Sequence, residues 1–446
     1  MKGKTVEMRF AGLVTITLGF LLLATHAVSA KELALDDIRK EYPVLQYLKG
    51  IQLSGFLTTF YSWNLNGASK GGPGTTAHRV NDFRYNDIEA NQFVLDMAEL
   101  QAVKLSTPES RVGFGVTADY GSTVRKLQSA GFGTKDPLGF TTNSFDLRQA
   151  YLTYKAPIGK GLDLKVGKFD SLVGLEVNAQ AYNLNTSRGL LYWLTPGVHT
   201  GLLLSYPLFD WLSLTAGVVN GWDVADDNND SKSITGSLSI TPAKNLTILL
   251  GAVYGAEQGS WGIFTEADDD NVRWIGDLVV IYNPTDKLTI NFTADMGEEK
   301  KNPFTINEAQ PTAIDNQWYS VGAIVKYQLT SAFSAALRGE WVRDDDGAVL
   351  FKHFDVPPVD ITDPTNPNFG SRTFADGGFR GFPQEIWEVT ATAEYKFSDN
   401  FRTRLEYRHD QSNKDVFRGR VDNATFTMSG GEDSQDTISV EFTALF

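Results

Sequence analysis

Cysteine is absent from all 446 residues of the chain. A disulfide framework, a cysteine nucleophile and a cysteine-bound metal are therefore excluded. Histidine is also scarce: after residue 30 only four remain, His78, His199, His353 and His409. The sequence contains no G-x-S-x-G, H-E-x-x-H or P-loop pattern. We therefore expect neither enzymatic activity nor a cofactor, and no metal site.

Long hydrophobic runs are the second absence. Beyond residue 30 no apolar stretch approaches the roughly twenty residues that a transmembrane helix needs. A soluble β-protein and a closed membrane barrel both satisfy this limit, because a barrel crosses a membrane with alternating strands rather than with apolar helices. The pattern along the chain has to decide between them.

The first thirty residues have the pattern of a secretory signal. Lys2, Lys4 and Arg9 precede an apolar run from Leu13 to Leu23, and Ala-Val-Ser-Ala follows at residues 27–30. This order predicts a signal peptide over residues 1–30 with cleavage after Ala30, an uncleaved anchor being the alternative.

The expected mature chain is strongly acidic. Without residues 1–30, 37 basic and 53 acidic residues remain, so the formal charge changes from −14 to −16. A charge of this sign argues against nucleic acid as a partner.

Most of the remaining chain alternates between apolar and polar residues in segments of about eight to twelve residues. In Thr437–Phe446 the apolar residues and the polar residues separate almost completely onto two faces. Phe401–Arg408 repeats the division, with Phe401, Leu405 and Tyr407 on one face and three arginines and a glutamate on the other. These patterns predict half-buried β-strands.

The connections between these segments alternate in length. Seven short turns lie near residues 107–110, 156–161, 207–210, 241–245, 283–286, 330–331 and 398–400. Eight long polar connections lie near residues 62–90, 121–144, 169–197, 220–231, 255–271, 296–316, 342–385 and 409–434. This asymmetry is typical of outer-membrane barrels, which have short periplasmic turns and long extracellular loops. We therefore predict an all-β fold, a transmembrane antiparallel β-barrel of about sixteen strands over residues 51–446.

Residues 31–50 break the strand pattern. Their apolar residues suit a short amphipathic helix interrupted at Pro43. We expect a periplasmic lead-in or a segment tucked into the lumen, with a disordered tail as the alternative.

Aromatic residues lie near many strand ends and suggest the interfacial girdles of a membrane barrel. Ordinary packing explains any single one equally well. The residues concerned are Tyr61, Trp63, Tyr154, Trp222, Tyr254, Tyr282, Trp341 and Trp387.

The third long connection, residues 169–197, is rich in amides and aromatic residues. If this loop folds inward, it narrows the lumen. Charged residues on the inner faces of the strands that contain Arg338 and Phe401–Arg408 would then lie across the channel from it. Such a charge distribution orders water and tunes ion preference, although inward charges can also simply pair with one another. The expected pore-lining residues are Glu176, Asn178, Gln180, Tyr182, Asn185, Arg188, Arg338, Glu340, Arg402, Arg404, Glu406 and Arg408.

Three acidic runs lie in the predicted loops, near residues 223–230, 266–270 and 344–346. The first could ligate calcium, but it lacks the central glycine and the distal glutamate of an EF-hand loop. We interpret all three as solvated loop segments whose charge favours cations at the mouth of the barrel.

Two stretches carry a family resemblance. Gln149–Glu176 and His199–Pro242, together with the opening Ile51–Phe56, resemble the OmpL-like family of outer-membrane β-barrel porins. The resemblance implies an outer-membrane barrel with porin activity, and it implies no catalytic or substrate-binding residue. Residues 296–385 are less similar to the family.

The sequence thus favours a porin in the outer membrane of a Gram-negative bacterium, where small hydrophilic solutes and ions diffuse through a water-filled barrel narrowed by its third loop. A channel selective for oligosaccharides or anions is the alternative, and a structural barrel without transport is a weaker one. The expected partners are the solutes and ions, membrane lipid and lipopolysaccharide, the outer-membrane assembly machinery and two further copies in a homotrimer.

Overall fold

The computed structural model describes residues 50–66, 81–84, 87, 89–124, 144–227, 229–257, 271–307, 310–345, 383–414, 416–417 and 432–446, with side chains except at 302–307 and 310–314. The expected signal peptide, nearly all of the lead-in, His78, His353 and the acidic run 266–270 lie outside these residues. The chain divides into two units, Met1–Ile51 and Gln52–Phe446, and the barrel belongs to the second. Within the described residues no helix is long and apolar enough to cross a membrane.

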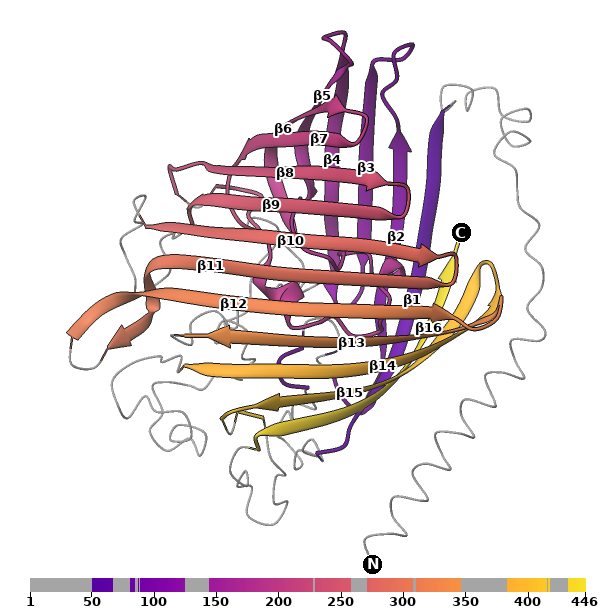
Figure 1. The fold of residues 1–446 in the computed structure, drawn as a ribbon, viewed down its shortest axis with the longest axis vertical. Helices are drawn as coiled ribbons and strands as arrows, with labels where there is room; N and C mark the ends of the chain where they lie inside the picture. The colour runs from indigo at the N-terminus through magenta and orange to yellow at the C-terminus, as the bar shows by residue number, and fades with distance from the viewer. Residues whose placement is uncertain are drawn as a thin grey trace, which may run out of the picture. The chain divides into compact units, whose positions relative to one another are not determined.

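Sixteen strands form one closed antiparallel barrel in which each strand pairs with its neighbours in sequence (Figure 1). The strands are β1 (Ile51–Asn64), β2 (Gln92–Lys104), β3 (Val112–Tyr120), β4 (Phe145–Ala156), β5 (Leu162–Asp170), β6 (Val198–Phe209), β7 (Leu212–Val219), β8 (Ser233–Ala243), β9 (Leu246–Ala256), β10 (Val272–Thr285), β11 (Leu288–Asn307), β12 (Gln310–Gln328), β13 (Phe333–Asp344), β14 (Gln384–Ser398), β15 (Phe401–Ser412) and β16 (Ser434–Leu445). The predicted fold class and strand number are confirmed.

The first and last strands close the barrel. β1 and β16 pair antiparallel from Phe56 opposite Leu445 to Asn64 opposite Thr437. The main chains of Gly55 and Phe446 then exchange two hydrogen bonds, each of 3.0 Å. Because hydrocarbon offers no hydrogen-bond partner to an open sheet edge, this pairing is what allows the sheet to cross a membrane.

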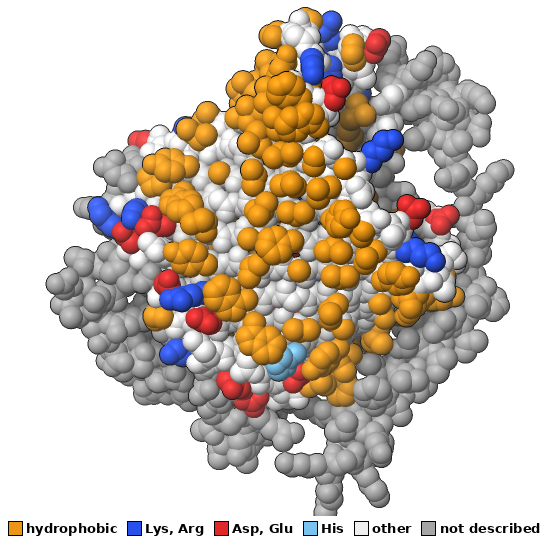
Figure 2. Space-filling view, in the orientation of Figure 1, with side chains coloured by type: hydrophobic (Ala, Val, Ile, Leu, Met, Phe, Trp, Pro, Cys, Tyr) orange, Lys and Arg blue, Asp and Glu red, His pale blue; other side chains and the backbone are white. Residues whose placement is uncertain are grey.

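The period-two pattern sorts the side chains between the outside and the inside of the barrel. On β15 Leu405 and Tyr407 are exposed, whereas Glu406 and Arg408, which alternate with them, are buried. Figure 2 shows hydrophobic side chains spread over the middle of the strands and charged side chains gathered towards the strand ends. The outer face therefore suits lipid, and the polar face points inward.

One predicted connection was wrong in its bounds. Residues 296–316 were expected to form a long loop, but β11 continues to Asn307 and β12 begins at Gln310. A ladder of backbone hydrogen bonds does not need lipid, so the two strands extend as a ribbon after their side chains become polar. Polarity there marks the end of the apolar band and not the end of the strands.

The position of Trp222 also differs from the prediction. Trp222 was expected in an interfacial girdle, but it follows β7 in a loop and packs against two clusters of buried hydrophobic residues. Tyr154, Tyr254 and Trp387 are exposed large residues on strands, as an interfacial position requires.

The alternation predicts that the same substitution destabilises the barrel to very different extents at two neighbouring positions of β9. Leu250 is exposed on the outer face, whereas Leu249 lies on the inner face with Val253. Leu250→Arg should destabilise the folded barrel by about 2–4 kcal/mol, because it places a cation in hydrocarbon near the middle of the strand. Leu249→Arg should cost much less. Urea unfolding in phospholipid vesicles measures both, and an equal or larger cost at Leu249 would contradict the assigned faces.

Candidate pore constriction

The third loop, defined here as residues 171–197, connects β5 to β6. It contains two single turns of 3-10 helix, Gln180–Tyr182 and Leu191–Leu194. Its two ends meet where the backbone N–H of Ser171 donates to the carbonyl of Gly197 at 3.0 Å. Between these ends the loop has little regular structure, so its main chain needs other hydrogen-bond partners.

Arginines on β13 and β15 donate to carbonyl oxygens of the third loop. Arg404 donates to Asn183 at 2.6 Å and to Asn185 at 3.2 Å. Arg338 donates to the carbonyl of Ser187 at 2.6 Å. Two further bonds run from Arg408 to Arg188, at 2.6 Å, and from Arg402 to Ala181.

Glutamates on the same strands accept from backbone N–H groups of the loop. Glu406 accepts from Thr186 at 2.6 Å and from Ser187 at 2.9 Å. Glu340 accepts from Leu191 at 3.2 Å. We call the inner faces of β13, β14 and β15 that make these contacts the charged wall. Its arginines supply donors for the carbonyl groups of the irregular loop, and its glutamates supply acceptors for the N–H groups of the loop.

Side chains add to this attachment. Glu176 of the loop pairs with Arg338 at 2.9 Å and accepts from the N–H of Gly189 at 2.6 Å. Asn185 donates to the hydroxyl of Thr392 on β14 at 2.7 Å. A Cβ at Gly189 would overlap the carboxylate of Glu340, so any larger residue at this position would displace the Glu340 side chain that accepts from the loop.

Apolar residues of the third loop pack on other parts of the barrel. Ala179, Ala181 and Tyr192 cluster with Phe56 of β1 and Met97 of β2. Val173 packs with Val253 of β9 and Ile275 of β10. Leu190, Leu191 and Leu194 pack with Trp318, Val342 and Ile386 of β12 to β14. The loop thus contacts strands on several sides of the barrel.

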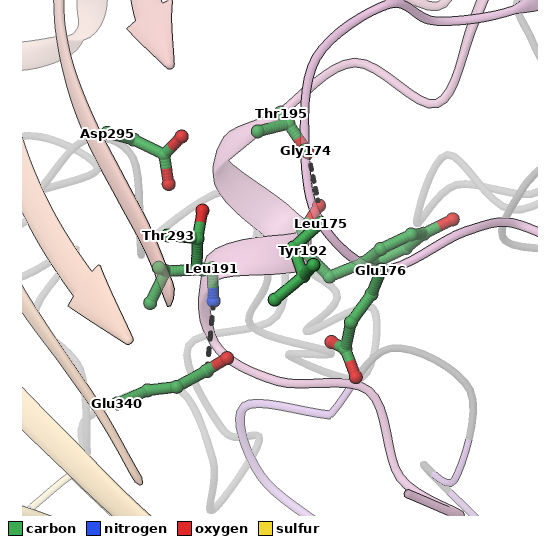
Figure 3. A pocket seen from close by; sticks show the side chains of 9 residues that line it. All are labelled: Gly174, Leu175, Glu176, Leu191, Tyr192, Thr195, Thr293, Asp295 and Glu340. Carbon is green, nitrogen blue, oxygen red and sulfur yellow. Dashed lines mark hydrogen bonds between the residues drawn. The ribbon is translucent and has the colours of Figure 1, made fainter. Parts of the chain in front are cut away.

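A small cavity lies where the loop meets β11 and β13. It has a volume of about 10 Å³, enough for one water molecule. Figure 3 shows its lining, with the N–H of Leu191 bonded to Glu340 and the carboxylate of Asp295 directed into the same space.

The structure brings together many of the residues that the sequence predicted to line the pore. Glu176, Asn185 and Arg188 contact the charged wall through side chain or main chain. Gln180 and Asn178 are buried. Gln180 donates to the carbonyl of Asn185 at 3.2 Å within the loop, and Asn178 donates to the carboxylate of Asp170 at 2.9 Å at the end of β5.

Tyr182 differs from these residues, since it is 57 % exposed and its ring meets that of Phe56 edge-on at 5.9 Å. The loop carboxylate Glu176 touches Arg338 directly, where an arrangement across the channel was expected. The assignment of all twelve residues to a pore lining remains a prediction.

Sequence reasoning missed the contribution of β14. Glu388 pairs with Arg338 at 2.8 Å, and Glu394 pairs with Arg404 at 3.0 Å. The alternation of Glu388, Thr390, Thr392 and Glu394 with apolar residues was visible in the sequence. Extending the period-two analysis to this segment would have found these glutamates.

A second buried charge cluster lies on β2 to β5. Arg148 pairs with Asp119 at 2.6 Å, with Asp170 at 2.5 Å and with Glu99. One cation therefore meets three carboxylates, and the neighbouring pair of Lys168 and Asp146 leaves this negative excess unchanged. This side of the interior is acidic.

Asp223 fixes the end of the third loop. One oxygen of Asp223 accepts from the N–H of Gly197 at 2.7 Å and from that of Val198 at 3.0 Å. Burial raises the pKa of Asp223 to about 6, and the nearby Glu257 also raises it while Arg273 lowers it. Within the described residues, no group of three or more histidine, aspartate or glutamate side chains is placed to hold a metal ion.

The raised pKa of Asp223 predicts a pH-dependent stability. Its ordinary value is 3.8 and its folded value is about 6, so the folded protein binds this proton more tightly than the unfolded chain. The resulting stabilisation is complete below the ordinary value and is lost as the pH rises through the folded value. Asp223→Asn cannot titrate, and asparagine tolerates the positive φ of 56° found there. The stability of the variant relative to the wild type should therefore increase between about pH 4 and pH 7. Urea unfolding across this range tests it, and a constant difference would contradict the assignment.

Comparison with solved structures identifies similar barrels. OprB of Pseudomonas putida aligns with a TM-score of 0.52 at 12 % identity, covering 92 % of this chain and 97 % of that one. The outer-membrane channel DcaP of Acinetobacter baumannii aligns with a TM-score of 0.50 at 12 % identity, covering 89 % and 97 %. The anion-selective porin of Comamonas acidovorans also gives 0.50, at 9 % identity, covering 89 % and 99 %. At these identities the likeness establishes the fold alone.

Sequence comparison establishes the family. No curated protein matches the chain. The family model described as "Putative beta-barrel porin-2, OmpL-like" matches residues 50–446, which include every strand of the barrel. The protein therefore belongs to the OmpL-like family of β-barrel porins and is located in the outer membrane of a Gram-negative bacterium.

Proposed function

We propose that this protein is a non-enzymatic diffusion pore for small hydrophilic solutes that prefers cations over anions. The third loop, which lies against the inner faces of β13 and β15, narrows the path. Membership in a porin family and a closed barrel with a polar inner face support this proposal.

The observation that carries the cation preference is the charge balance inside the barrel. Among the buried residues that the structure describes, sixteen are aspartate or glutamate and seven are lysine or arginine. Charge in a narrow, low-dielectric passage acts strongly on ions, because less water screens it than in bulk solution. A negative excess raises the local concentration of cations and lowers that of anions.

The arginines do not favour the alternative of an anion channel. Arg338, Arg404 and Arg408 each lie within 3.5 Å of a carboxylate oxygen. Their charge is therefore compensated locally, and it is not offered to a passing anion as an open row. A selective path for anions would need arginines that face water.

Planar-bilayer recording tests the proposal. With a potassium chloride gradient across the membrane, the reversal potential should have the sign of potassium preference. Asp96→Asn should reduce that preference, because it removes a carboxylate that is buried on the inner face of β2, where it accepts from the hydroxyl groups of Thr58 and Thr123. Asp210→Asn, at an exposed turn after β6, is the matched control and should leave it unchanged.

Two outcomes would contradict the proposal. A reversal potential of the opposite sign would remove the cation preference. Absence of any conductance from a folded barrel, identified by its heat-modifiable migration in gels, would remove the pore itself.

A further inference from the structure

We propose that the third loop is an autoinhibitory plug, and that solutes pass only when residues 176–191 leave the charged wall. The proposal rests on the pore function proposed above and describes the regulation of the same site. The structure then represents the closed state of the barrel.

The third loop contacts the barrel over a wide extent and does not only narrow one side of the lumen. Its main chain is attached to β13 and β15, whereas its apolar residues pack on β1 and β2 and on β9 and β10. A segment that touches opposing parts of the barrel wall leaves little free cross-section for water between them.

The charged wall is covered by the loop. Arg338 has no exposed surface, Arg404 and Arg408 are each 1 % exposed, and Glu406 is 2 % exposed. In an open pore, side chains on an inner face would meet water. Here the described loop replaces that water with its own carbonyl and N–H groups, so the wall binds protein and not solute.

The bonds between loop and wall are strong enough to hold a closed state. Carbonyls at Ala181, Asn183, Asn185, Ser187 and Arg188 and N–H groups at Thr186, Ser187 and Leu191 all have partners on the wall. Hydrogen bonds that involve a charged group are stronger than neutral ones, and low dielectric strengthens them further. When the loop leaves, water would hydrogen-bond to the same charged side chains, and these bonds would offset part of the energy lost with the loop contacts. A contact of this kind suits a two-state switch.

A second layer supports the closure. Phe83 from the connection after β1 and Phe417 from the connection after β15 meet edge-on at 5.4 Å. Both belong to the buried cluster that contains Leu190, Leu191 and Trp318. Arg84 is also buried and pairs with Asp410 of β15 at 2.7 Å. These apolar side chains, which pack on Leu190 and Leu191, oppose the entry of water at this part of the loop.

The loop has a place where its backbone can turn. Gly174 has a φ of 97°, a conformation that glycine adopts without strain, and it lies just before the first residue that contacts the wall. The inner faces of β7 and β8 carry Ser213, Thr215, Ser237 and Ser239, which are only partly buried. The N–H of Gly174 donates to Asp277 of β10 at 3.0 Å, so release of the loop would break this bond while the backbone of Gly174 changes conformation.

Two substitutions separate the loop from the wall by independent means. Gly189→Val introduces side-chain atoms where even a Cβ would overlap Glu340, and it changes no charge. Glu406→Ala removes the acceptor of two loop N–H groups. Gly339→Ala is the matched control for the first, because its Cβ would meet nothing closer than 3.9 Å. Glu385→Ala, on an exposed side chain of β14, is the control for the second.

Single-channel recording of the full-length protein in potassium chloride tests the plug. The wild type and both controls should conduct only in brief openings and should be closed for most of the recording. Gly189→Val and Glu406→Ala should each raise the time-averaged conductance by about tenfold or more, since each removes closed-state interactions of the strength of charged hydrogen bonds or their steric equivalent. Heat-modifiable migration shows that each variant is folded, and Gly189→Val keeps the test valid if Glu406→Ala fails to fold.

The outcomes are distinguishable. Wild-type conductance that is already high and unchanged in both folded variants would overturn the plug while leaving the pore intact. Silence from the wild type and from both variants, each shown to be folded, would overturn the proposed pore. Higher conductance in Gly189→Val and Glu406→Ala, but not in the two controls, would support both the pore and the plug.

Discussion

The structure depends on one constraint, which is that no backbone N–H or carbonyl group can remain unpaired where water is absent. For the sheet, this constraint requires β1 to pair with β16, and the sixteen strands close on themselves. Closure in turn gives the sheet an outside and an inside. The period-two sequence then places apolar side chains against lipid and polar side chains against the interior.

The same constraint applies to the third loop. An irregular segment inside the barrel cannot form a ladder with a neighbouring strand, so its main chain needs side-chain partners. The alternating arginines and glutamates of β13 and β15 provide them, with Arg404 and Arg338 donating to carbonyls and Glu406 accepting from N–H groups. The inward charges of this wall therefore have a structural role in the closed barrel, and their role in permeation begins when the loop leaves.

The charge balance follows from this division of roles. On the charged wall each arginine is compensated by glutamates, including Glu388 and Glu394 of β14. On the other side Arg148 alone faces three carboxylates. The net negative charge of the interior thus arises mainly from groups that do not hold the loop. Regulation and ion preference can consequently be altered by different substitutions.

Much of this fold could be predicted from the sequence, because strand number, inward and outward faces and turn length are local properties. The division of Phe401–Arg408 into two faces is an example, and Arg404 and Leu405 lie where the pattern placed them. The bounds of β11 and β12 could not be predicted, since a polar ribbon beyond the membrane has no apolar face to mark it. The contacts of the site could not be predicted either. Glu176 and Arg338 are separated by 162 positions in the sequence, and no periodicity indicates that they form an ion pair. Their direct contact depends on how far the loop enters the barrel, which is a property of the tertiary structure.

Attachment of the third loop to the charged wall can be tested most directly by cross-linking in intact outer membranes. The chain contains no cysteine, so Asn185→Cys and Thr392→Cys introduce a single pair at side chains that now touch at 2.7 Å. Mild oxidation should join them in high yield, detected as a changed migration of the denatured chain that reduction reverses. Absence of the cross-link in a folded barrel would show that the loop does not lie on β14, and it would contradict both the attachment and the plug.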